Sequence, residues 1–350
     1  MVGERQRRKP NQGVTIREVA ARARVSPMTV SRVINRESNV KAETRELVDA
    51  AIRELNYSPS PAARSLAGSG PYRLGLLYDN PSMGYLSEFL LGALDESSRT
   101  GSQVLVERCG EGEQAGAALG NLLKAGVDGL ILPPPLCESP PVLEAMRRAG
   151  AAAVAVAPGH PSERMATIRI DNELAARELT EYLLSLGHRR FGFIKGHPNQ
   201  TVSEQRLQGF LAALAAAGIS KEDVRIEQGY FTYRSGLDAA ETLLARKPHP
   251  TAIFAANDDM AAATASLAHR RGFDVPQALS IVGFDDTLVA ASVWPALTTV
   301  HQPVAAMARA AVDLLLEEIR RLREGGGAPR QLLHQHTLII RDSTAPAPRQ

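Results

Sequence analysis

At 350 residues, with 44% hydrophobic and 22% charged side chains, the chain is too long for one typical domain and too apolar for a disordered or fibrous protein. The net charge of +2 conceals an asymmetry, because residues 1–70 hold 13 basic and 7 acidic side chains, a balance of +6 that leaves −4 for the remainder. A small basic domain on an acidic body is typical of a nucleic-acid-binding protein.

Cysteine usage and hydropathy exclude several other classes. The only cysteines are Cys109 and Cys137, which are too few for a disulfide framework and show no zinc-ligand spacing. They are expected to be buried apolar side chains in a reducing, cytoplasmic setting. No early apolar run and no stretch of about 18 apolar residues occurs, so we expect neither export nor a membrane span.

The first predicted elements are two short helices within residues 14–35, after a disordered basic tail over residues 1–13. Thr15 is expected to cap the first helix. Ser26 is expected to cap the second, with Pro27 at its first position, where the missing N–H costs nothing. Two short helices joined by a tight turn form a helix-turn-helix, although an ordinary helical hairpin with a solvated polar face has the same pattern.

The second helix should bury its apolar side chains and present a polar face to a major groove. Met28 and Arg32 are expected to read base edges, since an arginine fits guanine bidentately. Ser31, Asn35 and Tyr57 are expected to meet phosphates. The candidate DNA-contacting residues of this region are Thr15, Ser26, Pro27, Met28, Thr29, Ser31, Arg32, Asn35 and Tyr57.

A third amphipathic helix is predicted over residues 39–57, with one apolar face that is expected to point inward and consists of Leu47, Val48, Ala51, Ile52 and Leu55. It is followed by residues 58–68, SPSPAARSLAG, a segment of small residues between prolines and a glycine. As a free segment this stretch should be mostly unfolded. Residues 61–67 could form about two helical turns, which are too few to be stable in water on their own.

The segments VTIREVAARARVSPMTVSRVIN and LNYSPSPAARSLAG together resemble the amino-terminal end of the LacI/GalR (lactose/galactose repressor) family of bacterial transcriptional regulators. The resemblance implies that residues 14–57 are an all-α helix-turn-helix DNA-binding domain and that residues 58–71 are a hinge and linker. It also implies that residues 61–67 become a hinge helix on operator DNA. Leu66 would then be the side chain that enters the minor groove.

From Tyr72 onwards, buried strands alternate with amphipathic helices in two successive runs, which predicts parallel sheets covered by helices on both faces. The resemblance continues through DGLIL, SLGHRRFGFIKG, ANDDMAAA, SIVGFDDT and WPALTTVHQP. It implies an α/β core like that of the periplasmic sugar-binding proteins, with two doubly wound parallel-sheet subdomains. The expected boundaries are 72–343 for the core, with 72–165 and 303–328 in subdomain 1, 166–300 and 331–342 in subdomain 2, and a tail over 344–350.

In open α/β sheets, ligands bind outside the carboxyl ends of the strands, and polar residues follow several strands here. The resemblance implies an effector site at these ends. Its candidate residues are Asp79, His160, Arg206, Phe231, Asn257 and Asp285. A guanidinium fork such as that of Arg206 suits hydroxyls or a carboxylate, although a surface salt bridge would also account for it.

The other candidates also have structural alternatives. Asn257 and Asp285 could cap the helices that follow them, and Asp79 and Phe231 could each be a cap or a core residue instead. His160 falls in a loop where many relatives carry an acid, so its role departs from the family pattern. Trp294, the only tryptophan, could reach the mouth of the cleft or pack beneath PALTT.

No catalytic constellation, metal site or cofactor motif is present in the sequence, so we expect no enzyme activity. Of three function classes, an α/β enzyme lacks a site and a sugar-binding module lacks an export signal. A ligand-responsive DNA regulator explains both halves of the chain. We therefore expect a homodimeric repressor that binds a near-palindromic operator. Its expected effector is a sugar, with a purine or nucleoside as the alternative.

Overall fold

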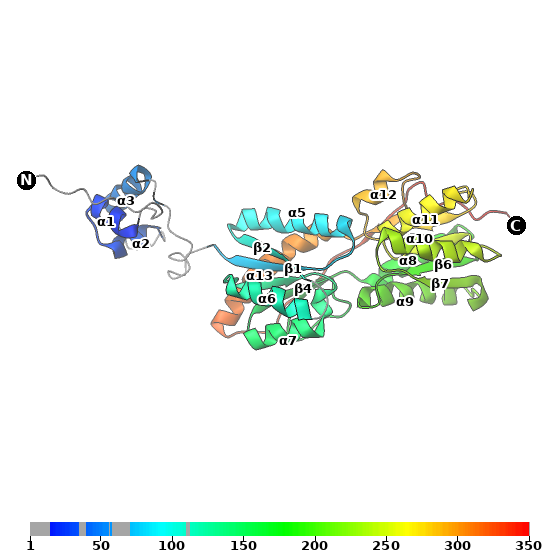
Figure 1. Cartoon of the computed structure of the whole chain (residues 1–350), viewed down its shortest axis with the longest axis horizontal. Helices are drawn as coiled ribbons and strands as arrows, with labels where there is room; N and C mark the ends of the chain where they lie inside the picture. The colour runs from blue at the N-terminus through cyan, green and yellow to red at the C-terminus, as the bar shows by residue number, and fades with distance from the viewer. Residues whose placement is uncertain (1–14, 35–39, 56, 58–70, 110–112, 350) are drawn as a thin grey trace, which may run out of the picture. The chain divides into compact units, whose positions relative to one another are not determined.

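The computed structural model describes residues 15–34, 40–55, 57, 71–109 and 113–349, and the chain divides at Pro71 and Tyr72 into two compact units (Figure 1). Asn35, Leu66 and the predicted hinge over 58–71, apart from Pro71 itself, lie outside the described residues. None of the helices in the described segments is long and apolar enough to cross a membrane.

The first unit contains three helices around a small apolar core. They are α1 (Ile16–Ala23), α2 (Pro27–Ile34) and α3 (Ala42–Glu54). Val19, Val30 and Val48 are fully buried where the three helices meet. The third helix is shorter than predicted, and the prediction that Leu47 faces inward is wrong, because its side chain is 59% exposed. Val48 and Ala51 set the inward stripe, and Leu47 lies outside it.

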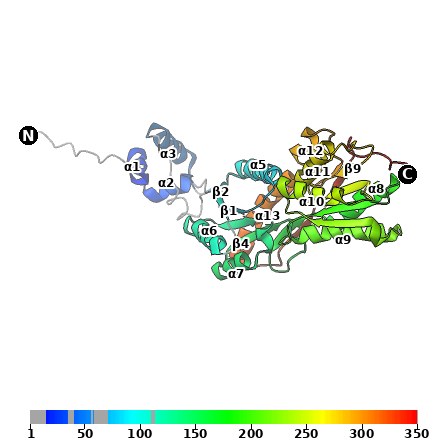
Figure 2. The ribbon, with the colours of Figure 1, turned by 45° about the vertical axis from the view of Figure 1, so that its right-hand side comes forward.

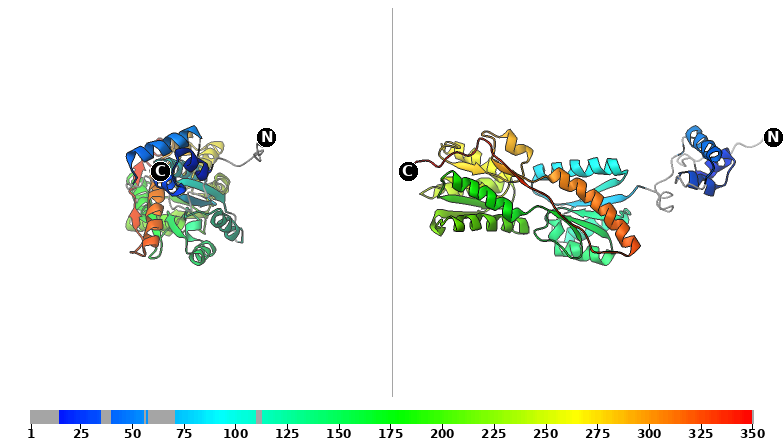
Figure 3. Two further views of the ribbon diagram at one scale, coloured as in Figure 1. Left: turned by 90° about the vertical axis from the view of Figure 1, so that its left-hand side faces the viewer. Right: turned by 180° about the vertical axis from the view of Figure 1, so that it is seen from behind.

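The second unit begins with a sheet whose described strands are all parallel, in the order β11-β5-β4-β3-β1-β2. The strands are β1 (Arg73–Tyr78), β2 (Gln103–Arg108), β3 (Gly129–Leu132), β4 (Ala152–Val156), β5 (Ala166–Arg169) and β11 (Gln331–Leu333). Helices α5 (Met83–Thr100) and α13 (Val304–Glu324) pack together on one face. Helices α6 (Glu113–Lys124) and α7 (Pro140–Ala149) pack together on the other (Figures 1 and 3).

A second parallel sheet has the order β7-β6-β8-β9, with β6 (Phe191–Lys195), β7 (Val224–Gln228), β8 (Ala252–Ala255) and β9 (Ser280–Val282). Helices α8 (Asn172–Ser185) and α9 (Thr201–Ala216) form one pair beside it. Helices α10 (Tyr233–Ala245) and α11 (Asp258–Arg270) form the other, followed by the short α12 (Leu288–Ser292) (Figure 2). Phe193 lies at the centre of the core, 4.8 Å from the ring of Phe210 and 5.0 Å from that of Phe254.

The chain passes between the two sheets after β5, after β10 (Thr299–His301) and between β11 and β12 (Thr337–Ile339), whose partner is β10. α13 packs on β4, so the chain returns to the first sheet after β10. β5 and β11 were expected in subdomain 2, but both belong to the first sheet. The alternation of strands and helices in the sequence predicts that a strand is present. Which sheet the strand joins depends on where the chain crosses from one subdomain to the other.

Candidate functional site

Capped helix ends and a left-handed turn build the helix-turn-helix. The amide of Thr15 donates to Glu18 Oε2 at 2.7 Å, and the amide of Glu18 donates to Thr15 Oγ1 at 3.4 Å. α1 ends at Arg24, whose φ of 54° turns the chain sharply. The amide of Thr29 then donates to Ser26 Oγ at 3.1 Å, so the predicted caps of both helices are confirmed.

The predicted DNA-contacting side chains follow the outer face and the start of α2. Val30 and Val33 are buried behind this face, and Met28 is 63% exposed on it. Thr15, Ser26, Pro27, Met28 and Arg32 are exposed, while Thr29 and Ser31 are half-buried. The helix therefore presents an apolar side chain and an arginine on a face that is held by a packed core.

Tyr57 was expected to meet a phosphate, but its side chain belongs to the apolar core of the first unit. It is 8% exposed, and burial raises the pKa of its hydroxyl. Packing therefore accounts for Tyr57 without a phosphate contact. Asn35 and Leu66 have no structural description against which to compare their predicted roles.

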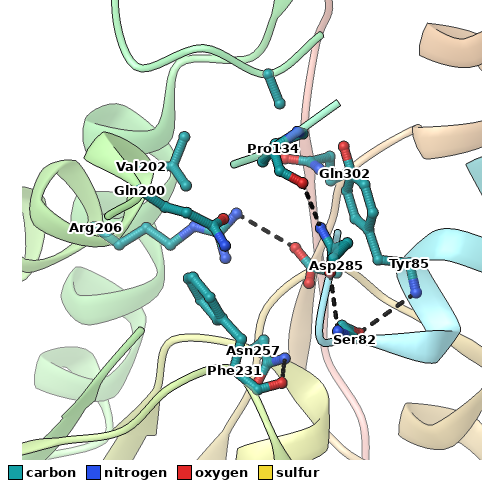
Figure 4. A pocket seen from close by; sticks show the side chains of 12 residues that line it. Ser82, Tyr85, Pro134, Gln200, Val202, Arg206, Phe231, Asn257, Asp285 and Gln302 are labelled. Carbon is teal, nitrogen blue, oxygen red and sulfur yellow. Dashed lines mark hydrogen bonds and ion pairs between the residues drawn. The ribbon is translucent and has the colours of Figure 1, made fainter. Parts of the chain in front are cut away.

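In the second unit, a cavity of about 30 Å³ lies where the carboxyl ends of the two parallel sheets meet (Figure 4). Segments that follow β1, β3, β4, β6, β7, β8 and β9 all contribute to its wall. The lining residues are Asn80, Ser82, Tyr85, Pro134, Ala157, Gln200, Val202, Arg206, Phe231, Asn257, Asp285 and Gln302. This is the position at which open α/β sheets bind ligands.

Four of the six predicted effector residues, Arg206, Phe231, Asn257 and Asp285, line this cavity. Asp79 lines a wider neighbouring cavity of about 520 Å³, which shares Asn80 and Gln200 with the first. His160 is exposed and is not among the lining residues of either cavity. Trp294 is 79% exposed and stacks on His269 with ring centroids 5.7 Å apart.

Arg206 is buried and bound by protein groups rather than by solvent. Its Nε donates to Asn172 Oδ1 at 2.9 Å, and its Nη1 donates to the carbonyl oxygen of Ala256 at 2.5 Å. Its Nη2 lies 3.3 Å from Asp285 Oδ1, and its guanidinium stacks 3.6 Å from the centroid of the Phe284 ring. The alternative of a surface salt bridge is therefore wrong, because both charged side chains are only 5–6% exposed.

Asp285 lies in a strained and buried loop. Its φ of 104° and the φ of 60° at Asp286 are uncommon for residues other than glycine, and such strain clusters at functional sites. Asp258 holds the loop by accepting the amide of Thr287 at 2.8 Å. Burial raises the pKa of the Asp285 carboxyl to about 7, although the Arg206 charge opposes this shift.

Two buried oxygen atoms in the cavity wall, Tyr85 Oη and Gln302 Oε1, have no hydrogen-bond partner among the described residues. Asp285 Oδ1 has only the ion pair with Arg206 Nη2. Buried polar atoms are normally paired, so unpaired ones in a cavity wall indicate a missing partner. The sequence analysis missed Tyr85 and Gln302. Tyr85 lies in the first turn of α5, the helix that follows β1, and Gln302 directly follows β10 in a segment that crosses between the sheets. A position shortly after a strand is the signal that could have found both residues.

Asn257 and Phe231 form a linked pair in the wall. Asn257 Oδ1 accepts the amide of Met260 at 3.1 Å and so caps α11, which confirms the capping alternative. Its Nδ2 donates to the carbonyl oxygen of Phe231 at 3.0 Å. Phe231, with a φ of 59°, presses against Gly196, where a Cβ atom would lie only 1.9 Å from Phe231 Cζ. The protein itself therefore fixes both side chains.

Comparison with known proteins identifies the architecture. The family described as bacterial regulatory proteins, lacI family, matches residues 15–60, and the periplasmic binding protein-like domain matches residues 180–344. The repressor PurR of Pectobacterium carotovorum subsp. carotovorum (strain PC1) is 36% identical over 342 residues, which is 95% of this chain and 98% of that protein. The ribose operon repressor of Escherichia coli (strain K12) is 34% identical over 309 residues, 87% of this chain and 93% of that repressor.

The structure of the lac repressor dimer bound to operator and the anti-inducer ONPF aligns with a TM-score of 0.83 and 29% identity, covering 95% of this chain and 100% of that one. The chain belongs to the lacI family of bacterial regulatory proteins. As a lacI-family protein it is a DNA-binding transcriptional regulator, and the two relatives are repressors rather than enzymes. The predicted fold class, a helix-turn-helix domain followed by a periplasmic-binding-protein-like core, is confirmed.

Proposed function

We propose that the protein represses transcription by binding a near-palindromic operator as a homodimer, and that a sugar-like effector in the 30 Å³ cavity changes its operator affinity. The observation that carries this proposal is the pair of buried oxygen atoms on Tyr85 and Gln302 that have no partner among the described residues. An amide oxygen can only accept, whereas a phenol hydroxyl can donate or accept, so the missing partner should offer both donors and acceptors. The hydroxyl groups of a sugar do both in several directions.

The aromatic and charged parts of the wall fit the same ligand. The Phe231 ring offers an apolar surface for a sugar face, and Arg206 has N–H groups beyond those that bind Asn172 and Ala256. A purine is the second candidate, because its N–H groups are also donors and its ring could stack on Phe231. The names of the two relatives, a ribose operon repressor and PurR, leave both candidates in place.

The size of the cavity supports a role in signalling. A volume of about 30 Å³ is only two to three times the roughly 10–15 Å³ that one water molecule needs, and it is too small for a sugar ring. An effector must therefore separate groups that now touch, including those carried by different sheets. Such a ligand binds one arrangement of the two sheets better than another, and the effect on DNA affinity equals that preference at most.

On the DNA side, Met28 and Arg32 would read base edges, and Ser26, Thr29, Ser31 and Asn35 would position α2 on phosphates. The segment 58–71, with Leu66 as the side chain in the minor groove, would connect these contacts to the core. An inserted apolar side chain costs a few kcal/mol of base unstacking, which added protein contacts offset.

A thermal-shift screen tests the effector class. The full chain would be heated with D-ribose, D-glucose, cellobiose, hypoxanthine, guanine and adenosine at millimolar concentration. A sugar should raise the midpoint for wild type, and the shift should be much smaller for Gln302→Leu and Tyr85→Phe. Stabilisation by a purine alone would replace the sugar by the second candidate, and an equal shift in wild type and both variants would place the ligand elsewhere.

A further inference from the structure

We infer that Glu138 is a positioning residue for the effector cavity. Its carboxylate belongs to the half of the core that is built on the first sheet, and it holds the beginning of α9, which lies beside the second sheet. This inference rests on the proposed function only for its consequence on ligand affinity. Glu138 ends the short helix η1 (Leu136–Glu138), which follows β3 of the first sheet. It lines neither the 30 Å³ cavity nor the wider cavity beside it.

Both oxygen atoms of this carboxylate accept backbone hydrogen bonds. Oε1 accepts the amide of Gly159 at 2.9 Å, in the loop between β4 and β5 of the first sheet. Oε2 accepts the amide of Thr201 at 3.1 Å, the first residue of α9 beside the second sheet. The Glu138 side chain therefore links η1 and the β4–β5 loop, which belong with the first sheet, to α9, which lies beside the second sheet.

The beginning of α9 depends on this contact because its own cap is missing. Gln200 occupies the N-cap position but makes no side-chain capping hydrogen bond. The first amides of a helix have no partner within the helix, and the helix dipole favours a negative charge at that end. Glu138 supplies both an acceptor and a charge from outside the helix.

The surrounding contacts show a close fit across the cleft. A Cβ atom on Gly159 would lie 2.4 Å from Thr201 Cγ2, so only glycine allows this approach of the two backbones. Gln205, one turn further along α9, donates its side-chain amide to the carbonyl oxygen of Gly159. Besides the contacts through Glu138, the loop at Gly159 is therefore held to α9 by one direct hydrogen bond and by close steric contact.

The same helix carries part of the effector cavity. Gln200, Val202 and Arg206 line the cavity, whereas Thr201 and Gln205 face the Glu138 contact. Movement of α9 away from the Gly159 loop must therefore move Arg206 relative to the wall that the first sheet supplies. Because an effector must separate groups carried by the two sheets, Glu138 favours the arrangement that leaves it no room, and the apparent ligand affinity scales with the fraction of molecules that have opened.

The test compares three variants of the full chain. Glu138→Gln keeps the size of the side chain but leaves only one acceptor oxygen for two amides. Thr201→Pro removes the donor while keeping a residue that helices tolerate at their first position, and Gln200 already has the extended backbone that a following proline requires. Glu144→Gln is the control, because among the described residues the Glu144 carboxylate forms hydrogen bonds with Arg147 and Arg148 of its own helix and with no residue of α9.

Hydrogen exchange gives a readout that needs no ligand. The Thr201 amide should exchange at least tenfold faster in Glu138→Gln than in wild type, and at an unchanged rate in Glu144→Gln. Equal exchange in wild type and Glu138→Gln would overturn the inference. In Thr201→Pro, which lacks that amide, faster exchange at the amides of residues 203–205 is expected.

The second readout is affinity for D-ribose and for hypoxanthine by calorimetry. Whichever probe binds wild type should bind Glu138→Gln and Thr201→Pro three to ten times more tightly, and Glu144→Gln equally well. A purely structural role would lower the melting temperature of the two variants and leave these affinities unchanged at 20 °C, which would overturn the inference. If neither probe binds wild type, the proposed effector class fails, and the exchange rate of Thr201 alone decides the role of Glu138.

Discussion

The outer face of α2 and the effector cavity hold their functional side chains in opposite ways. On α2, Met28 is 63% exposed and points to solvent, while the packing residues Val30 and Val33 lie behind it. In the cavity, Arg206 and Asp285 are about 5% exposed and bind one another. A change on α2 should therefore alter binding alone, whereas a change in the cavity should alter stability and binding together.

The largest expected effect is the loss of stability in Arg206→Leu. This change leaves the Asp285 carboxyl buried without its counter-ion, and breaking a buried pair typically costs ~3–5 kcal/mol. Urea unfolding at pH 8 measures the cost. It should be smaller at pH 6, where Asp285 can bind a proton instead.

The double variant Arg206→Leu with Asp285→Asn is the matched control for this cost, and asparagine tolerates the positive φ at this position. It should unfold at higher urea concentration than the single variant. If both variants unfolded at the same urea concentration, the buried charge of Asp285 would not be the cause of the lost stability. The contrast between the cavity and α2 would then weaken.

Arg32→Ala should give the second-largest effect, and only on DNA binding. Loss of a bidentate contact to guanine should cost ~1–3 kcal/mol at one position of each half-site. The measurement is anisotropy with an operator selected from random DNA and with variants of that operator. Arg22→Ala is the control, because Arg22 binds Glu54 of α3 with its Nε at 3.0 Å from Oε1. Equal weakening of operator and random DNA by Arg32→Ala would show a phosphate contact instead.

Asp285 should also give the protein a pH-dependent stability. Its folded-state pKa is raised from 3.8 to about 7, so the folded state holds a proton that the unfolded state has lost between these values. Stability should therefore fall as pH rises from 4 to 7, by up to ~1.4 kcal/mol per pH unit from this group. Urea midpoints measured across this range should show a flatter profile in Asp285→Asn, and parallel profiles would refute the assignment.

The smallest effect is expected at Leu47, which the sequence places on the wrong side of α3. Leu47→Ala should change the free energy of unfolding by no more than ~0.5 kcal/mol, because its side chain is 59% exposed. Val48→Ala, one residue further on, should cost ~1–3 kcal/mol by leaving a cavity in the core. Similar losses of stability in the two variants would show that Leu47 faces the core, as the sequence predicts.

These contrasts explain which parts of the structure could be predicted from the sequence. Local signals were sufficient for the caps at Thr15 and Ser26. Sheet membership of β5 was not predictable, because the same buried strand fits either sheet and the crossing point is a tertiary feature.

The cavity was predictable only in part for the same reason. The family resemblance brought out Arg206, and the resemblance together with strand-end position brought out Asn257 and Asp285; all three lie in its wall. It could not reveal that Tyr85 and Gln302 have unpaired oxygen atoms, because pairing depends on residues far away in the sequence. The exposed position of His160 likewise follows from the path of a loop, which periodicity does not determine.

The most direct test is an anisotropy titration of the selected operator with wild type and Gln302→Leu, with and without the sugar that stabilises wild type in the thermal screen. The account predicts that the sugar changes the operator affinity of wild type. It predicts that Gln302→Leu binds operator equally well and responds only at much higher sugar concentration, because an unpaired acceptor in the cavity wall has been removed. An undiminished response of Gln302→Leu at the same sugar concentration would contradict the claim that this cavity controls DNA binding.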